Sequence, residues 1–140
     1  YKDGYASDMT RMAYVGTPSE EFTTVHAIVN QAVQAGWQAA RAGNPAEAVD
    51  AAARRVISDA GYGEYFVHRT GHGIGLSVHE PPYMMAGNDL PIPLHAAFSI
   101  EPGIYLPGKF GVRLEEVVIA GENDARILSA VSRDIHVVAG

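Results

Sequence analysis

The chain has 140 residues, of which 47% are hydrophobic and 19% charged, a composition typical of one folded domain and not of a disordered chain. A net charge of −6 without any Lys/Arg cluster argues against nucleic-acid binding. No apolar run approaches the roughly 18 residues of a membrane span, and the absence of cysteine excludes a disulfide scaffold, a zinc ribbon and a thiol nucleophile. We therefore expect a globular protein that does not partner membranes, with the cytoplasm as its compartment.

The first elements are a strand and a helix. Residues 5–15 read as a strand interrupted by polar side chains. Thr17 is then predicted as the helix N-cap, with Pro18 at the first helical position and Glu20 completing a capping box. Gly43 is the predicted stop. Helical spacing between these signals is kept by the apolar residues Phe22, Val25, Ile28, Val29, Ala32, Val33 and Ala40.

The same signals repeat in a second helix. Asn44 is its predicted N-cap, Pro45 opens it, and Gly61 ends it. Its apolar stripe is predicted to comprise Ala48, Val49, Ala52, Ala53, Val56 and Ile57.

Strands and loops dominate the rest of the chain. We expect, in order, a short strand at 65–67, a glycine-rich turn at 71–75, a proline-rich loop at 81–93, a hairpin over 97–119 and closing strands at 126–129 and 134–138. Two helices followed by a curved antiparallel sheet make an α+β fold.

The hairpin places two glutamates opposite each other. If its turn centres on Gly108, residues equidistant from that glycine face one another, and Glu101 and Glu115 form such a pair. Like charges directly opposed destabilise a sheet unless something neutralises them, and a divalent cation would do so. The alternatives are two solvated surface carboxylates, or neutralisation by Arg113.

The period of two divides the hairpin into two faces. Pro102 lacks the N–H of a ladder position, so a bulge or an edge is expected there. The face of the two glutamates also carries Gly103, Tyr105, Gly111 and Arg113. The opposite face is predicted to pack into the core through Ile100, Ile104, Val112 and Leu114.

Histidines surround the glycine-rich segment. His68, His72 and His79 could be aimed into one cleft by a backbone that glycine leaves free, although each alone is more typical of a surface loop. Asp8 is unusual within a strand and could instead pair with Arg11. Three other histidines lack sequence partners and are interpreted as structural or surface residues: His26, His95 and His136.

Asp8, His72, Glu101 and Glu115 together supply one imidazole and three carboxylates. This hard, oxygen-rich donor set suits Mn, Co, Zn or Fe(II). Several carboxylates also suit a site with two metal ions that clamp an activated water molecule.

Several ordered blocks of the sequence resemble the signature motifs of the pita-bread metallopeptidases, within the branch of prolidase and aminopeptidase P. The blocks are residues 4–11, 71–75, His79-Glu80, 100–103 and 113–115. This resemblance implies the C-terminal half of a pita-bread domain. It also implies a metal-dependent exopeptidase, an Xaa-Pro dipeptidase or aminopeptidase, that hydrolyses the bond before proline with a metal-bound hydroxide.

The resemblance also implies a role for each site residue. Asp8, His72, Glu101 and Glu115 would hold two divalent ions, Mn or Co being the first candidates, with Glu115 bridging. Glu101 would also shuttle a proton, and His79 would hydrogen-bond the substrate carbonyl. The pocket for the residue of the peptide substrate after the scissile bond would be lined by His68, Tyr105 and Arg113.

One part of the family pattern has no counterpart. The family uses a second aspartate on the strand before the one that matches Asp8, a position that would precede Tyr1, and the first half of its catalytic domain has no match either. We therefore expect residues 1–140 to be a partial catalytic domain that binds metal poorly and hydrolyses nothing efficiently alone. We also expect self-association or a homodimer through the sheet edge next to 4–15.

Three other functions found among proteins of the pita-bread fold are alternatives to the Xaa-Pro peptidase. Methionine aminopeptidase is disfavoured by the arginine of Arg113-Leu114-Glu115, and creatinase by the four retained ligands. A non-catalytic pita-bread peptide-binding domain, or an inactive fragment, is the alternative from a different functional class.

Overall fold

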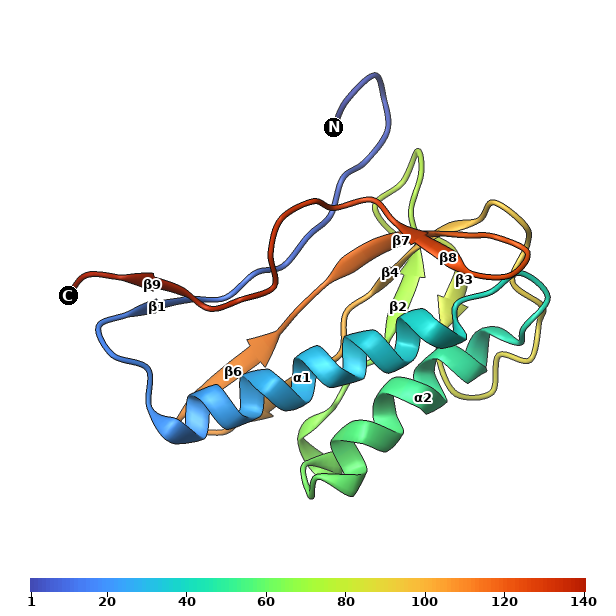
Figure 1. Ribbon diagram of the computed structural model, residues 1–140. Coiled ribbons are helices and arrows are strands. Elements are labelled where there is room, and N and C mark those ends of the chain that lie inside the picture. The colour runs from blue at the N-terminus through green and yellow to red at the C-terminus, as the bar shows by residue number, and fades with distance from the viewer.

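Two helices lie on one side of a curved antiparallel sheet in the computed structural model, which describes residues 1–140 (Figure 1). Helix α1 spans Glu20–Ala39, and α2, Ala46–Asp59, returns alongside it. No helix of the structure is both long and apolar enough to cross a membrane. The α+β prediction is confirmed.

The strands form three sheets. The main sheet has the order β3-β2-β4-β7-β8 and is antiparallel. A two-stranded antiparallel ladder, β5-β6, continues it, and β1 pairs in parallel with β9. Their bounds are β1 Ala13–Val15, β2 Gly71–Gly73, β3 Glu80–Met84, β4 Ala97–Ile100, β5 Gly103–Leu106, β6 Phe110–Arg113, β7 Glu116–Ala120, β8 Ala125–Ile127 and β9 His136–Val138, with one 3-10 turn, η1, at Gly63–Tyr65.

The helices pack on the predicted core face of the hairpin. Their buried side chains join those of the strands in one cluster that includes Val25, Val33, Val49 and Ile57. Gly36 lets α1 lie close to β4, because a Cβ there would be 2.9 Å from Ile100 Cγ2. All four residues predicted for the core face are fully buried: Ile100, Ile104, Val112 and Leu114.

Both helices exist as predicted, but their N-caps differ. Ser19, not Thr17, caps α1, since its backbone is extended and its hydroxyl accepts a hydrogen bond from the Phe22 N–H at 3.1 Å. Asn44 does not cap α2 but donates to the Ala39 carbonyl at the end of α1. The backbone N–H of Ala40 likewise bonds back to Trp37, so α1 ends before Gly43.

Gly61 ends α2 as predicted. Its φ of +85° is the left-handed conformation that glycine adopts freely after a helix. The predicted stripe of α2 is buried at Val49, Ala53 and Ile57, and the structure adds Asp50 to it.

The N-terminal segment is not the strand predicted over 5–15. Only Ala13–Val15 form a ladder. The remainder is held by single hydrogen bonds to separate parts of the chain: Ala6 N–H to Gly75, Glu115 N–H to Thr10, and His136 N–H to Met12. Because these partners lie far apart in the sequence, the local pattern could not indicate them.

The predictions of a glycine-rich turn at 71–75 and of a strand at 65–67 are also wrong. Residues 63–65 form η1, and Gly71–Gly73 is β2, which lies inside the main sheet. A Cβ on Gly71 would overlap the Ser99 carbonyl oxygen, and one on Gly73 would overlap that of Pro81. Glycine therefore serves here to let strands approach, not to turn the chain. The proline-rich segment begins as strand β3 rather than as a loop, while the two predicted closing strands are present as β8 and β9.

The hairpin register is confirmed. Gly103 pairs with Arg113 and Tyr105 with Gly111, and the same register continues where Ile100 pairs with Glu116. Between these pairs the ladder is open. Pro102 has no N–H, the Glu101 N–H bonds outward to Thr70 O at 2.7 Å, and the Glu115 N–H bonds outward to Thr10 O at 3.2 Å. The two glutamates thus lie at the same level of neighbouring strands, in the gap.

The close approach at β2 yields a stability prediction. Gly71→Ala should lower the free energy of unfolding by about 3 kcal/mol, because the new methyl group would have to displace backbone of β4. Gly140→Ala is the control, since its Cβ would meet no atom nearer than 3.7 Å. Urea unfolding measures both, and equal stabilities of the two variants would contradict this account of β2.

Candidate metal centre

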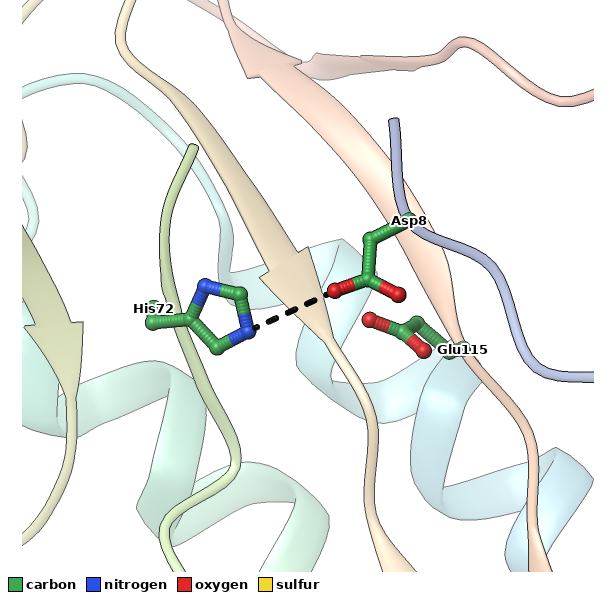
Figure 2. Close-up of side chains that lie close together, drawn as sticks. All are labelled: Asp8, His72 and Glu115. Carbon is green, nitrogen blue, oxygen red and sulfur yellow. Dashed lines mark ion pairs between the residues drawn. The ribbon is translucent and has the colours of Figure 1, made fainter. Parts of the chain in front are cut away.

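The four side chains singled out in the sequence meet at one place. One ligand atom each of Asp8, His72 and Glu115 lies within 4.8 Å of the others (Figure 2). His72 Nε2 is 4.0 Å from Asp8 Oδ2 and 3.0 Å from an oxygen of Glu101, so the fourth residue belongs to the same cluster. Four separate segments of the chain therefore supply one group of donors.

The backbone explains this convergence. His72 lies in β2, beside the end of β4, and its N–H donates to Ser99 Oγ at 3.0 Å. The outward hydrogen bonds of Glu101 and Glu115 attach the hairpin to Thr70 and Thr10. Thr70 lies two residues from His72, and Thr10 lies two residues from Asp8, so each bond brings in another side chain of the cluster. The gap in the ladder is thus the point at which all four segments are joined.

His72 and Glu101 form a charge-assisted pair. Burial alone would lower the pKa of His72, but its hydrogen bonds to Glu101 and to the Gly73 carbonyl raise that pKa overall. Burial would raise the pKa of Glu101, but hydrogen bonds from His72 and Ser99 lower it overall. Each group therefore favours the charged form of the other when no metal is bound.

Glu115 is not compensated in this way. Its Oε2 accepts a hydrogen bond from Thr10 Oγ1 at 2.7 Å, but its Oε1 is buried without any partner. Burial raises its pKa, and the neighbouring charges of Glu101 and Asp8 add to that rise, which the Thr10 bond and the positive charge of Arg113 only partly offset.

A cation would bind the oxygen of Glu115 that no protein atom contacts by a hydrogen bond. An unpartnered buried oxygen among three carboxylates requires positive charge or a proton. Carboxylate oxygens and one imidazole nitrogen are donors that hard divalent ions accept. The residues present therefore fit a divalent metal ion.

The sequence offered Arg11 as an ion-pair partner of Asp8, and Arg113 as a partner of the two glutamates. Neither ion pair is present. Arg11 does not pair with Asp8 but donates to Glu115 O at 2.6 Å and to Glu116 Oε1 at 2.8 Å. Arg113 forms no ion pair with the two glutamates of the cluster; it donates to Thr10 Oγ1 and to the Tyr105 hydroxyl, both at 3.3 Å.

A cavity of about 500 Å³ opens beside the cluster. Its lining is polar except for one methionine and comprises His68, Arg69, His72, His79, Met85, Glu101 and Arg113. Two predicted substrate-binding residues, His68 and Arg113, are among them, and so is the predicted catalytic residue His79.

Tyr105 connects His68 and Arg113 by hydrogen bonds. His68 Nδ1 is 2.8 Å from the Arg69 carbonyl, so we assign the ring proton to Nδ1. His68 Nε2 then accepts from the Tyr105 hydroxyl at 2.8 Å, and that hydroxyl accepts from Arg113 Nη1. The three residues predicted to bind substrate therefore form one hydrogen-bonded wall, in which His68 and Arg113 line the cavity and Tyr105, which does not line it, joins them.

The remaining predicted residues are also placed. The ring of exposed His79 lies edge-on to His72, with centroids 4.2 Å apart. His26 is buried, and burial lowers its pKa, whereas His95 and His136 are exposed. None of these last three lines the cavity.

Sequence reasoning missed several residues that support the cluster. Ser99 donates to Glu101 Oε1 at 3.0 Å, and Thr10 donates to Glu115. Arg69 and Met85 line the cavity. The one available signal was the position of Thr10 two residues after Asp8; no local pattern distinguishes the others from ordinary polar or loop residues.

Comparison with known proteins gives a consistent result. The family model described as metallopeptidase family M24 matches residues 1–122. A probable dipeptidase PepE from Mycobacterium bovis is 49% identical over 99% of the chain, and an Xaa-Pro dipeptidase from Lactobacillus helveticus is 44% identical over 97%. The chain spans 37% of the length of each of these relatives.

The fold has a solved counterpart. The crystal structure of an X-Pro aminopeptidase from Thermotoga maritima superposes with a TM-score of 0.94 at 46% identity, covering 96% of this chain and 38% of that one. The fold is therefore the pita-bread fold, and the arrangement of two helices on the curved sheet corresponds to part of it.

The raised pKa of Glu115 predicts a pH dependence in the metal-free protein. The folded state holds this proton more tightly than the unfolded chain, whose ordinary value is 4.5. Ionisation of Glu115 therefore destabilises the fold. The contribution of Glu115 to the free energy of unfolding falls as pH rises through its raised pKa. Glu115→Gln should melt at a higher temperature than wild type at neutral pH in the presence of a chelator, and the two should converge near pH 4.

In the complete gene product the same substitution should weaken metal binding, since it removes a charge from the ligand set. Thermal melts across pH, with and without Mn²⁺, measure both effects. Asp124→Asn, at an exposed turn, is the control. A Glu115→Gln variant that is less stable than wild type at every pH would contradict the uncompensated charge.

Proposed function

Because the chain belongs to metallopeptidase family M24, we propose that it forms part of a metal-dependent exopeptidase that hydrolyses the bond before proline in Xaa-Pro peptides. The observation that carries the proposal is the cluster of Asp8, His72, Glu101 and Glu115, with its unpartnered buried oxygen, beside a polar cavity. The names of the relatives, Xaa-Pro dipeptidase and X-Pro aminopeptidase, support the substrate class.

We propose that the four clustered residues hold two divalent ions, Mn²⁺ or Co²⁺ being the first candidates. Bound there, the ions would acidify a water molecule and polarise the peptide carbonyl. Glu115 is the expected bridging ligand, since it is the most buried of the three carboxylates and one of its oxygens is buried without a partner.

Glu101 is proposed to move the proton. Its Oε1 is bound by His72 and Ser99, whereas its Oε2 has no hydrogen-bond partner. Its lowered pKa means that it is ionised at neutral pH, so Oε2 can accept a proton from water and return it to the leaving amine.

His79 and the hydrogen-bonded wall are proposed to orient the substrate. His79 lines the cavity next to His72, so its ring N–H can donate to the carbonyl oxygen as negative charge develops there. His68, Tyr105 and Arg113 would receive the residue after the scissile bond, with the guanidinium of Arg113 available to polar or carboxylate groups of that residue.

We propose that residues 1–140 act within a larger catalytic domain, because the chain spans only 37% of its relatives. Little metal binding and no efficient hydrolysis are expected from these residues alone. The cytoplasm is the compartment we propose, and the cysteine-free composition is compatible with it.

A substrate comparison tests the function. The complete gene product, loaded with Mn²⁺ or Co²⁺, should release proline from Ala-Pro far faster than it cleaves Met-Ala, and a chelator should abolish the reaction. Preference for Met-Ala would favour a methionine aminopeptidase. Two bound metal equivalents without hydrolysis of either peptide would contradict the peptidase assignment and favour a peptide-binding domain.

Substitution of His79 tests its role. His79→Ala should leave the metal content unchanged and lower kcat by about 100-fold, because its hydrogen bond forms mainly in the transition state. His136→Ala, at an exposed histidine on β9, should leave kcat unchanged. Loss of metal from His79→Ala would show that His79 is a ligand instead.

We also propose self-association through β1, whose only strand partner is β9. Val15 on this strand is 71% exposed, and an unpaired edge attracts another strand. Sedimentation of the 140-residue chain at high concentration should show a dimer that Val15→Lys weakens. A strictly monomeric wild-type chain would contradict this proposal.

A further inference from the structure

A buried carboxylate lies in the middle of the apolar face of α2. Asp50 is 1% exposed, and on its helix it neighbours Val49, Ala53 and Ile57, which are fully buried. A buried carboxylate is costly unless it is paired and hydrogen-bonded, so its partners identify what it holds in place.

Asp50 has partners on two different elements. Arg54, one turn along α2, binds it through two nitrogens, Nε to Oδ2 at 3.0 Å and Nη2 to Oδ1 at 3.1 Å. Oδ1 also accepts the Thr70 N–H at 3.0 Å and the Thr70 hydroxyl at 2.8 Å. The carboxylate therefore joins α2 to the segment that leads into β2.

Arg54 also binds the same segment directly, at residues that precede Thr70. Its Nη1 donates to the Phe66 carbonyl and its Nη2 to the His68 carbonyl, both at 2.9 Å. Its guanidinium also stacks on the Phe66 ring, 4.1 Å from the centroid. The two side chains together bind residues 66, 68 and 70, so they fix both ends of this short segment.

That segment carries two parts of the site. The His68 ring lines the cavity, packs edge-on against Phe66 and is hydrogen-bonded to the Tyr105 hydroxyl. The Thr70 carbonyl accepts the Glu101 N–H at 2.7 Å. The cavity wall and the backbone of the proposed proton carrier are therefore both connected to one ion pair on α2, although the Thr70 N–H also donates to the Met84 carbonyl of β3 at 3.0 Å.

We propose that Asp50 and Arg54 are positioning residues: the pair holds the segment from Phe66 to Thr70 so that His68 faces the substrate cavity and Glu101 keeps its place in the cluster. Neither residue lines the cavity, so they act only through this segment. The kinetic part of the inference rests on the proposed peptidase function; the structural part does not.

Arg54→Lys is the main variant. Lysine keeps the charge and can still pair with Asp50, but it cannot reproduce the planar fork that holds two carbonyls. In the complete gene product we expect KM for Ala-Pro to rise about tenfold, because contacts through His68 exist in both the ground and transition states. We expect kcat to fall as well, because Glu101 is the proposed proton carrier. Arg55→Lys, at an exposed position on the same helix, is the matched control.

Two measurements on the 140-residue chain need no activity. The Glu101 and Thr70 amides should exchange hydrogen about tenfold faster in Arg54→Lys than in wild type, while amides in the middle of α1 keep their rates. The NMR signals of the His68 ring should shift. Thr70→Val should give part of both effects, and Thr70→Ser, which retains the hydroxyl, should restore wild-type behaviour.

Each outcome decides the proposal. If Arg54→Lys lowers only the free energy of unfolding, with unchanged exchange at Glu101, unchanged His68 signals and unchanged KM, the pair is merely structural and the inference is overturned. If the complete gene product hydrolyses no peptide, the proposed function fails, whereas the exchange rates and ring signals still support or overturn the positioning role.

Discussion

Two consecutive strand ladders share one register, and the two levels between them are left unpaired. Pro102 cannot donate there, and the N–H groups of Glu101 and Glu115 turn outward to Thr70 and Thr10. A sheet normally satisfies such groups across the ladder; here each instead binds a segment that carries another donor of the cluster. The site therefore depends on an interruption of regular hydrogen bonding over two residue pairs of the hairpin, Glu101/Glu115 and Pro102/Leu114.

This arrangement concentrates negative charge where the protein can neutralise only part of it. His72 and Ser99 bind one oxygen of Glu101, and Thr10 binds one oxygen of Glu115, but the second oxygen of Glu115 is buried without a partner. The opposite face of the same strands is fully buried against the helices, and that apolar burial offsets the electrostatic cost of the cluster. A fold stabilised from its helix side can keep an uncompensated charge for binding a cation.

The helical layer also reaches the site by polar contacts. Asp50 and Arg54 connect α2 to the cavity wall, and Arg11 connects the N-terminal segment to the carbonyl of Glu115. In both cases a guanidinium binds backbone carbonyls of segments without a regular ladder. Irregular backbone next to the cluster is thus held by side chains whose sequence neighbours give no hint of that function.

The sequence by itself determined the features that depend on neighbours along the chain. The turn at Gly108 and strict alternation of apolar and polar residues determine the hairpin register and its buried face, and a 3.6-residue period determines the two helices. Only the tertiary structure decided what depends on distant partners. Asp8 and His72 reach the glutamates, Gly71 lies in a strand and Asn44 caps the other helix, because their partners are brought near by folding. Local propensity describes the backbone of each segment, whereas hydrogen bonds and charges between segments exist only after the core has packed.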